Sequence, residues 1–147
     1  MTYTYEYPRM MVTVDAVIFL VENNEKKPKV LLIKRKNNPY QNSYALPGGF
    51  PEMDELLVDA AKRELFEETG LTNIHLKQFY TFDAVERDPR GRNISVAFLG
   101  LTSPDNCQLK AGDDASEADW FPVNQPPSLA FDHKEVIDIA LRQLEKK

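Results

Sequence analysis

Three glutamates, Glu64, Glu67 and Glu68, lie close together near the middle of the chain. If this stretch is helical, a turn of about 100° per residue puts the three side chains within roughly a 100° arc on one face. Like charges at this spacing repel and weaken a helix by about 0.2–0.5 kcal/mol per pair. The cluster is therefore either a solvated acidic face or a site for a hard cation such as Mg²⁺ or Mn²⁺. The helix alone leaves both readings open.

The residues before and after the glutamates predict how they are positioned. A short strand is expected at 44–46, followed by the turn Pro47-Gly48-Gly49. A helix is expected from about Glu55 to Thr69, with Asp54 as its N-cap. Gly70 follows the last turn and is expected to end the helix in a left-handed conformation.

Apolar periodicity predicts the remaining elements. Further strands are expected at 12–21, 29–35, 74–84, 94–102 and 119–123, and a closing helix at 132–145. The first two strands should pair antiparallel. Strands outnumber helices, and each helix has one apolar face, so we predict an α/β fold with a mixed sheet and helices on both faces.

The composition is that of an ordinary globular protein. The chain has 147 residues, 42% of them hydrophobic and 28% charged, which suits a single domain over 1–147. Residues 1–11 contain three tyrosines and are expected to form an edge strand or an arm against a partner subunit. No apolar run approaches the ~20 residues of a membrane span, and no secretory signal is visible. With the single Cys107, these features favour a cytoplasmic protein.

The formal net charge of −5 argues against nucleic acid as a partner, because nucleic-acid-binding proteins usually present a basic face. It does not argue against a small phosphorylated substrate. A bound divalent metal can reverse the sign of the local electrostatic field.

The stretch from Gly49 to Leu71 resembles the Nudix box at every defined position: Gly49, Glu55, then Arg63-Glu64-Leu65-x-Glu67-Glu68-x-Gly70-Leu71. The order of the flanking strands and of the closing helix is similar as well. The resemblance implies an α/β/α sandwich that hydrolyses a nucleoside diphosphate linked to another group, with Mg²⁺ or Mn²⁺ as cofactor. Such a metal can lower the pKa of water and stabilise the leaving group.

The resemblance also implies roles for single residues. The metal ligands would be Glu64, Glu67 and Glu68 with the carbonyl of Gly48 or Gly49, and the catalytic carboxylates would include Glu67 and Glu68. Glu55 and Arg63 would orient the loop on the helix, with Gly70 as a structural position. A plain surface ion pair is the alternative for Glu55 and Arg63.

Relatives in this family usually need a further acid from a later loop. The loop from Gly112 to Trp120 offers Asp113, Asp114, Glu117 and Asp119. We expect Glu117, because a glutamate just before a Trp-Phe strand has this place in many relatives. Asp114 is the second choice, and a solvated loop carboxylate is the alternative for each.

A second informative segment, Arg87-Asp88-Pro89-Arg90-Gly91-Arg92, resembles that of ADP-ribose pyrophosphatase-like Nudix proteins and of related ADP-ribose-sensing regulators. Its candidate substrate-binding residues are Arg87, Asp88, Arg90 and Arg92, because planar guanidinium groups bind phosphate in a bidentate manner. A water-exposed hairpin tip is the alternative. The later segment Ala130-Phe131-Asp132-His133 is also similar to that subgroup, and His133 either contacts substrate or braces the final helix.

Three functions are consistent with these features. The first is metal-dependent hydrolysis of ADP-ribose to AMP and ribose 5-phosphate. The second is a pool-cleaning nucleoside triphosphate pyrophosphohydrolase, which the arginine-rich segment disfavours. The third is a non-catalytic ADP-ribose sensor. It is disfavoured because such regulators carry a C-terminal winged helix, whereas this sequence stops at Lys147. Many relatives are dimers, so a homodimer is an open expectation.

Overall fold

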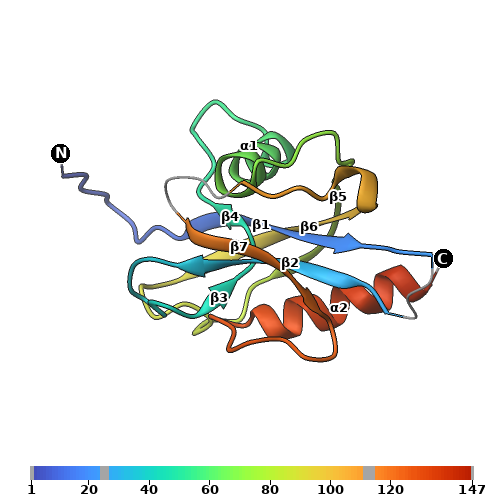
Figure 1. Cartoon of the computed structure of the whole chain (residues 1–147). Helices are drawn as coiled ribbons and strands as arrows, with labels where there is room; N and C mark the ends of the chain where they lie inside the picture. The colour runs from blue at the N-terminus through green and yellow to red at the C-terminus, as the bar shows by residue number, and fades with distance from the viewer. Residues whose placement is uncertain (1, 24–26, 111–114, 147) are drawn as a thin grey trace.

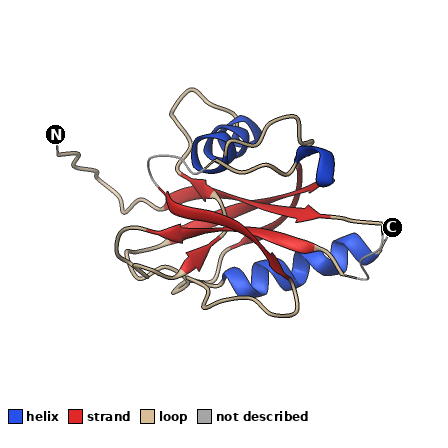
Figure 2. Ribbon diagram, in the orientation of Figure 1, coloured by secondary structure: helices blue, strands red, loops and turns tan. Residues whose placement is uncertain are grey.

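Two helices enclose a mixed sheet in the computed structural model, which describes residues 2–23, 27–110 and 115–146 (Figures 1 and 2). The strands are β1 (Met11–Leu20), β2 (Lys29–Arg35), β3 (Tyr44–Ala45), β4 (Gly48–Gly49), β5 (Lys77–Phe82), β6 (Asn93–Thr102) and β7 (Ala115–Pro122). The helices are α1 (Leu57–Thr69) and α2 (His133–Glu145), and a 3₁₀ turn lies at Pro104–Asn106. The predicted α/β/α sandwich is confirmed.

In the described part of the chain, the sheet has the strand order β3-β2-β1-β6-β5, with β4 paired to β1 and β7 paired to β2. The predicted antiparallel pairing of β1 with β2 is confirmed. The central pair is parallel: β1 runs beside β6 over its whole length, from Met11 opposite Asn93 to Leu20 opposite Thr102. This pair brings the start of β1 next to the segment that precedes β6.

The side chains of β1 alternate between the two layers, as expected for a strand buried on both faces. Val14, Ala16 and Ile18 belong to the core cluster beneath α1. Val17 and Phe19 belong to the cluster beneath α2. The strand is thus shared by two hydrophobic cores.

The predicted start of the first helix is wrong. The helix begins at Leu57, and its N-cap position is Leu56, which makes no side-chain capping bond. Asp54 lies instead in a turn in which the Glu55 N–H donates to the Glu52 carbonyl at 3.2 Å. The predicted C-terminus is confirmed, because Gly70 has φ 79° and its N–H donates to the Phe66 carbonyl.

Two strands begin three or more residues away from their predicted start. The strand expected at 74–84 is reduced to β5, because Ile74 and Leu76 pack as a buried loop in the core cluster beneath α1. The last strand, expected at 119–123, already begins at Ala115, because β7 pairs with β2 over most of its length. That pairing places Glu117 within a strand rather than in a loop.

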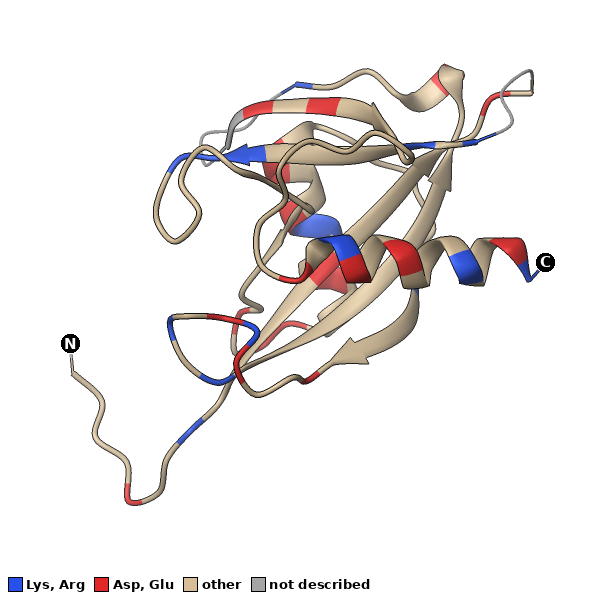
Figure 3. Cartoon of the chain, turned by 90° about the horizontal axis from the view of Figure 1, so that it is seen from below, with Lys and Arg blue, Asp and Glu red and all other residues tan. Residues whose placement is uncertain are grey.

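Acidic and basic residues are interspersed along α2 (Figure 3). Lys134 and Asp138 form an exposed ion pair of 2.9 Å there. Residues 2–10 are exposed and extend away from the sheet (Figure 1). Neither α1 nor α2, nor any other helix among the described residues, has the length and apolar character needed to cross a bilayer.

Candidate active site

A pocket of about 240 Å³ lies where β1, β2, β4 and α1 meet the segment before β6 and the start of α2. Eight of the candidate residues from the sequence line it: Gly48, Gly49, Glu64, Glu68, Arg87, Asp88, Arg90 and His133. These residues come from β4, α1, the segment before β6 and the start of α2. They are distant in sequence, and folding brings them together.

The two glycines of β4 allow α1 to lie close to the sheet. The Gly48 N–H donates to Glu68 Oε1 at 2.9 Å. A Cβ added at Gly49 would stand 2.5 Å from Glu64 Oε2. The missing Cβ at Gly49 therefore lets the backbone approach the Glu64 carboxylate, whereas the missing Cβ at Gly48 lets β4 lie against Val14 and Asp15 of β1.

Arg63 binds most of the remaining motif residues. Its guanidinium makes a bidentate pair with Glu55 at 2.8 and 3.0 Å. Nη1 also donates to Glu64 at 2.7 Å and to Glu67 at 3.0 Å, and Nη2 donates to the Phe50 carbonyl. The hydrogen bonds that Arg63 donates to Glu55 are the main cause of its raised pKa. Arg63 thus fixes the loop to α1 and offsets the repulsion between glutamates.

The donor chemistry of this site fits a hard divalent cation. Glu64 and Glu68 line the pocket next to the Gly48 and Gly49 backbone, and carboxylate and carbonyl oxygens are the ligands that Mg²⁺ and Mn²⁺ prefer. Glu67 does not line the pocket and faces Arg63. Within the described residues, no three Asp, Glu, His or Cys side chains are gathered closely enough to hold a metal together.

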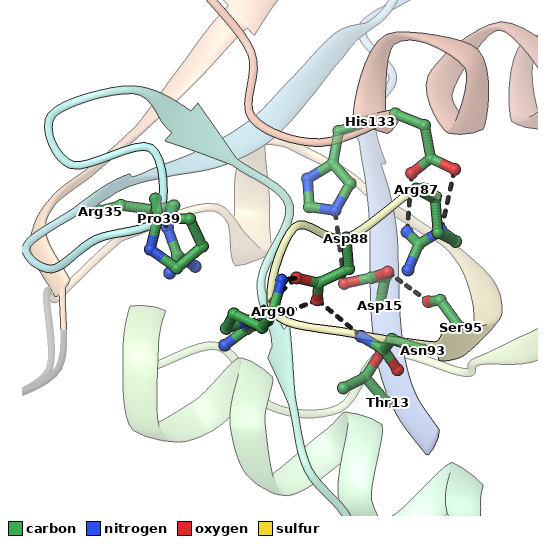
Figure 4. Close-up of polar contacts among 11 residues, drawn as sticks. Thr13, Asp15, Arg35, Pro39, Arg87, Asp88, Arg90, Asn93, Ser95 and His133 are labelled. Atoms are coloured by element: carbon green, nitrogen blue, oxygen red, sulfur yellow. Dashed lines mark hydrogen bonds and ion pairs between the residues drawn. The ribbon is translucent and has the colours of Figure 1, made fainter. Parts of the chain in front are cut away.

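The arginine-rich segment is folded onto the protein by its own ion pairs (Figure 4). Arg87 is buried and makes a bidentate pair with Asp132 at 2.9 and 2.6 Å. Asp88 accepts bidentate hydrogen bonds from Arg90 and a third from Asn93. Burial alone would raise the pKa of Asp88, but these hydrogen bonds lower it to about 2. Asp88 is therefore an ionised carboxylate that holds Arg90 in place.

Sequence reasoning missed a buried polar network on the floor of the pocket. Asp15 accepts a short hydrogen bond from the Ser95 hydroxyl, and its Oδ1 lies 3.7 Å from His133 Nε2. His133 Nδ1 accepts the Leu46 N–H at 3.0 Å. The signal for this network was weak: Asp15 is an isolated carboxylate within an apolar strand.

His133 braces the start of α2 and also lines the pocket. Burial is the main cause that lowers its pKa, which agrees with a neutral ring whose Nδ1 is an acceptor. Arg35 is a further pocket residue that the sequence analysis did not select.

The other predicted residues lie apart from the pocket or beyond the described chain. Glu117 is exposed on β7, accepts the Tyr44 hydroxyl at 3.3 Å and lies 4.0 Å from Lys34 Nζ. Neither Glu117 nor the half-buried Arg92 lines the pocket. Asp113 and Asp114 lie outside the described residues.

Comparison with known proteins places this geometry in a family. A model described as the NUDIX domain matches residues 11–139. The chain belongs to the Nudix family. Among curated Nudix relatives, it is 44% identical over 136 residues to an ADP-ribose pyrophosphatase of Methanocaldococcus jannaschii, covering 92% of this chain and 76% of that protein. It is 34% identical over 146 residues to the ADPR responsive transcriptional repressor NtrR of Acinetobacter baylyi, covering 97% of this chain and 57% of the repressor.

Solved Nudix structures share the fold. A MutT/nudix family protein from Enterococcus faecalis superposes with a TM-score of 0.88 at 33% identity, covering 99% of this chain and 66% of that one. The NUDIX domain of Shewanella oneidensis NrtR complexed with ADP ribose superposes with a TM-score of 0.82 at 35% identity, covering 94% of this chain and 90% of that one. The predicted family and fold are thus confirmed for this Nudix chain.

Proposed function

We propose that the chain hydrolyses ADP-ribose to AMP and ribose 5-phosphate in a reaction that depends on a divalent metal, Mg²⁺ or Mn²⁺. One observation carries the proposal: the carboxylates of Glu64 and Glu68 and the guanidinium of Arg90 line the same pocket. A pyrophosphate needs both kinds of group, because cations bind its oxygens while carboxylates hold the metal. The similarity to an ADP-ribose pyrophosphatase supports the choice of substrate.

In this mechanism each residue has a stated task. Glu64 and Glu68 would hold the divalent ion together with a carbonyl of the glycine turn, and the bound ion would lower the pKa of a water molecule and neutralise charge on phosphate oxygens. Arg90, held by Asp88, would orient a phosphate group. Glu68 is our choice for the carboxylate that takes the proton from water, because it is buried at the pocket.

The remaining predicted roles are part of the same proposal. Glu67 would join the metal ligands after leaving Arg63, to which it is bound at 3.0 Å. Glu117 would complete catalysis from β7, and Arg92 would contact the substrate from the end of its segment. Each of these roles requires a change in side-chain position, since none of the three residues lines the pocket.

The test is AMP release from ADP-ribose with Mg²⁺ or Mn²⁺, compared between the wild-type chain, Glu68→Gln and Glu145→Gln. We expect Glu68→Gln to lower kcat by about 100-fold or more. Glu145 is exposed at the end of α2, so Glu145→Gln should match the wild type. Equal AMP release by Glu68→Gln and wild type would contradict the proposed site. Pyrophosphate release from nucleoside triphosphates would instead favour the pool-cleaning activity.

A non-catalytic ADP-ribose sensor is the second candidate. It is supported by the similarity to a repressor described as ADPR responsive and to an NrtR domain complexed with ADP ribose. Calorimetry with ADP-ribose, combined with the assay for AMP release, separates the sensor from the hydrolase, because a sensor would bind tightly and release no AMP in the presence of metal.

We also propose a cytoplasmic homodimer without nucleic-acid binding. Sedimentation of the chain with and without residues 2–10 would test the contribution of that segment to dimerisation.

A further inference from the structure

A guanidinium suited to a phosphate also lies outside the arginine-rich segment 87–92. Arg87 lines the pocket, but its Nε and Nη2 donate to Asp132 in a bidentate pair. Arg90 is held in the same way by Asp88. Arg35 reaches the pocket from the opposite side, at the end of β2, about fifty residues earlier in the sequence. It is the third guanidinium of this pocket.

Arg35 is anchored at one nitrogen and lacks a carboxylate partner. Its Nε donates to the Pro39 carbonyl at 2.7 Å (Figure 4). None of the ion pairs found within 2–23, 27–110 and 115–146 includes Arg35. Arg35 is half-buried, and the carboxylates of Asp88 and Glu68 act on it electrostatically without forming an ion pair with it. Its terminal nitrogens are therefore suited to an anionic ligand.

The Phe131 ring lies next to two of the three pocket arginines, Arg35 and Arg90. The Arg35 Cζ lies 5.1 Å from the ring centroid, and the Arg90 Cζ lies 5.5 Å from it. Tyr40 packs against the same ring with centroids 4.8 Å apart. Phe131 also has φ 51°, a left-handed conformation that costs a residue with a side chain about 1 kcal/mol or more. Backbone strain of this kind is often found at ligand sites.

The electrostatics of this cluster also favour an anion. Burial is the main cause that lowers the pKa of Arg35, and the nearby charge of Arg90 adds to the effect, while the carboxylates of Asp88 and Glu68 oppose it. Two guanidinium groups beside one ring repel each other, and the ring offsets only part of that repulsion. An anion bound between them would relieve it.

We propose that Arg35 binds phosphate oxygens of the substrate and that Phe131 is a positioning residue for Arg35. The inference rests on the proposed function, since the anion is the pyrophosphate of the substrate. Arg35 then approaches that group from β2 while Arg90 approaches it from the segment before β6. The alternative is that Arg35 only ties the 36–42 loop to β2 through Pro39.

The experiment compares Arg35→Met and Arg35→Lys with Arg142→Met, a change of an exposed arginine on α2. We expect Arg35→Met to raise the KM for ADP-ribose by about tenfold or more, with a smaller change in kcat. Arg35→Lys keeps the charge but loses the planar fork, so it should recover only part of the affinity. Arg142→Met should leave both constants unchanged. An unchanged KM in Arg35→Met overturns the inference.

Phe131→Leu tests the positioning role through coupling. Alone it should raise KM less than Arg35→Met does, and the double variant should be no worse than Arg35→Met. If the KM increases of the two single variants multiply in the double variant, Phe131 does not act through Arg35. Thermal unfolding of each variant separates a loosened 36–42 loop from a lost phosphate contact. Only a loosened loop should lower the unfolding midpoint in the absence of ligand.

The outcomes also separate this inference from the proposed function. AMP release by the wild type with an unchanged KM in Arg35→Met overturns the inference alone. Binding of ADP-ribose without turnover overturns the hydrolase, and the Kd of Arg35→Met from calorimetry then decides the role of Arg35. A wild-type chain that neither binds nor cleaves ADP-ribose overturns both.

Discussion

Arg87 and Asp132 form a bidentate ion pair, with the Arg87 side chain 3% exposed and the Asp132 side chain 18% exposed. The pair joins the segment before β6 to the residue before α2, so it connects two parts of the pocket wall that are 45 positions apart. Burial alone would lower the pKa of Arg87, but the hydrogen bonds that it donates to Asp132 raise it. Arg87 is therefore better explained as part of the frame than as a mobile phosphate ligand.

Breaking this pair should destabilise the fold. Asp132→Asn or Arg87→Met should lower the free energy of unfolding by about 3 kcal/mol, because each leaves a buried group without its partner. The exposed pair of Lys134 and Asp138 is the matched control, and Asp138→Asn should cost less than about 0.5 kcal/mol. Urea denaturation measures both. A loss in Asp132→Asn as small as that in Asp138→Asn would contradict the structural role.

The two glycines of β4 should respond differently to alanine. A Cβ at Gly49 would meet the far end of the Glu64 side chain, 2.5 Å away, so Glu64 must move while the strand stays in place. We expect Gly49→Ala to lower kcat/KM by about tenfold or more. Its free energy of unfolding should differ from that of the wild type by less than about 1 kcal/mol.

Gly48→Ala is the contrasting change. Its Cβ would stand 2.1 Å from the Val14 carbonyl oxygen, so β4 and β1 must separate. We expect a loss of about 2 kcal/mol or more in the free energy of unfolding. Thermal unfolding and steady-state kinetics on both variants measure the difference. Equal free energies of unfolding for Gly48→Ala and Gly49→Ala would show that moving β4 away from β1 costs no more than moving the Glu64 side chain.

His133 should make stability depend on pH near neutrality. Its folded-state pKa is lowered, chiefly by burial, so the unfolded chain takes up a proton first as the pH falls below about 6.5. Stability is therefore fully present above that pH and declines below it. Unfolding free energies between pH 7.5 and 5 should show a shallower slope in His133→Gln than in the wild type. His75 is exposed, so His75→Gln should retain the wild-type slope.

Asp88 should contribute stability that is lost only in acid. Its folded pKa of about 2 lies below the ordinary value of 3.8, so its contribution is present above about pH 4 and disappears as the pH falls through 2. At pH 6, Asp88→Asn should be less stable than the wild type by about 2 kcal/mol. That difference should shrink toward zero near pH 2. A difference that is constant with pH would assign the loss to packing rather than to charge.

Local patterns were readable from the sequence, and long-range contacts were not. The end of α1 at Gly70 and its apolar face depend on residues within a few turns, so the sequence predicts them well. The hydrogen bond from Ser95 to Asp15 joins residues 80 positions apart and depends on the register of the parallel pair β1 and β6. No short pattern encodes that register. The same holds for the placement of Arg35 beside Phe131.

The pocket has consequences for how the molecule unfolds. Glu64 and Glu68 come from the layer of α1, whereas His133 and Phe131 belong to the start of the layer of α2. A partly folded chain with either helix detached would lack the lining residues of that layer. Any ligand that contacts both layers therefore binds only the fully folded form, and mass action makes it stabilise the two layers as one cooperative unit. Ligand-induced protection from hydrogen exchange should accordingly reach both helices at once.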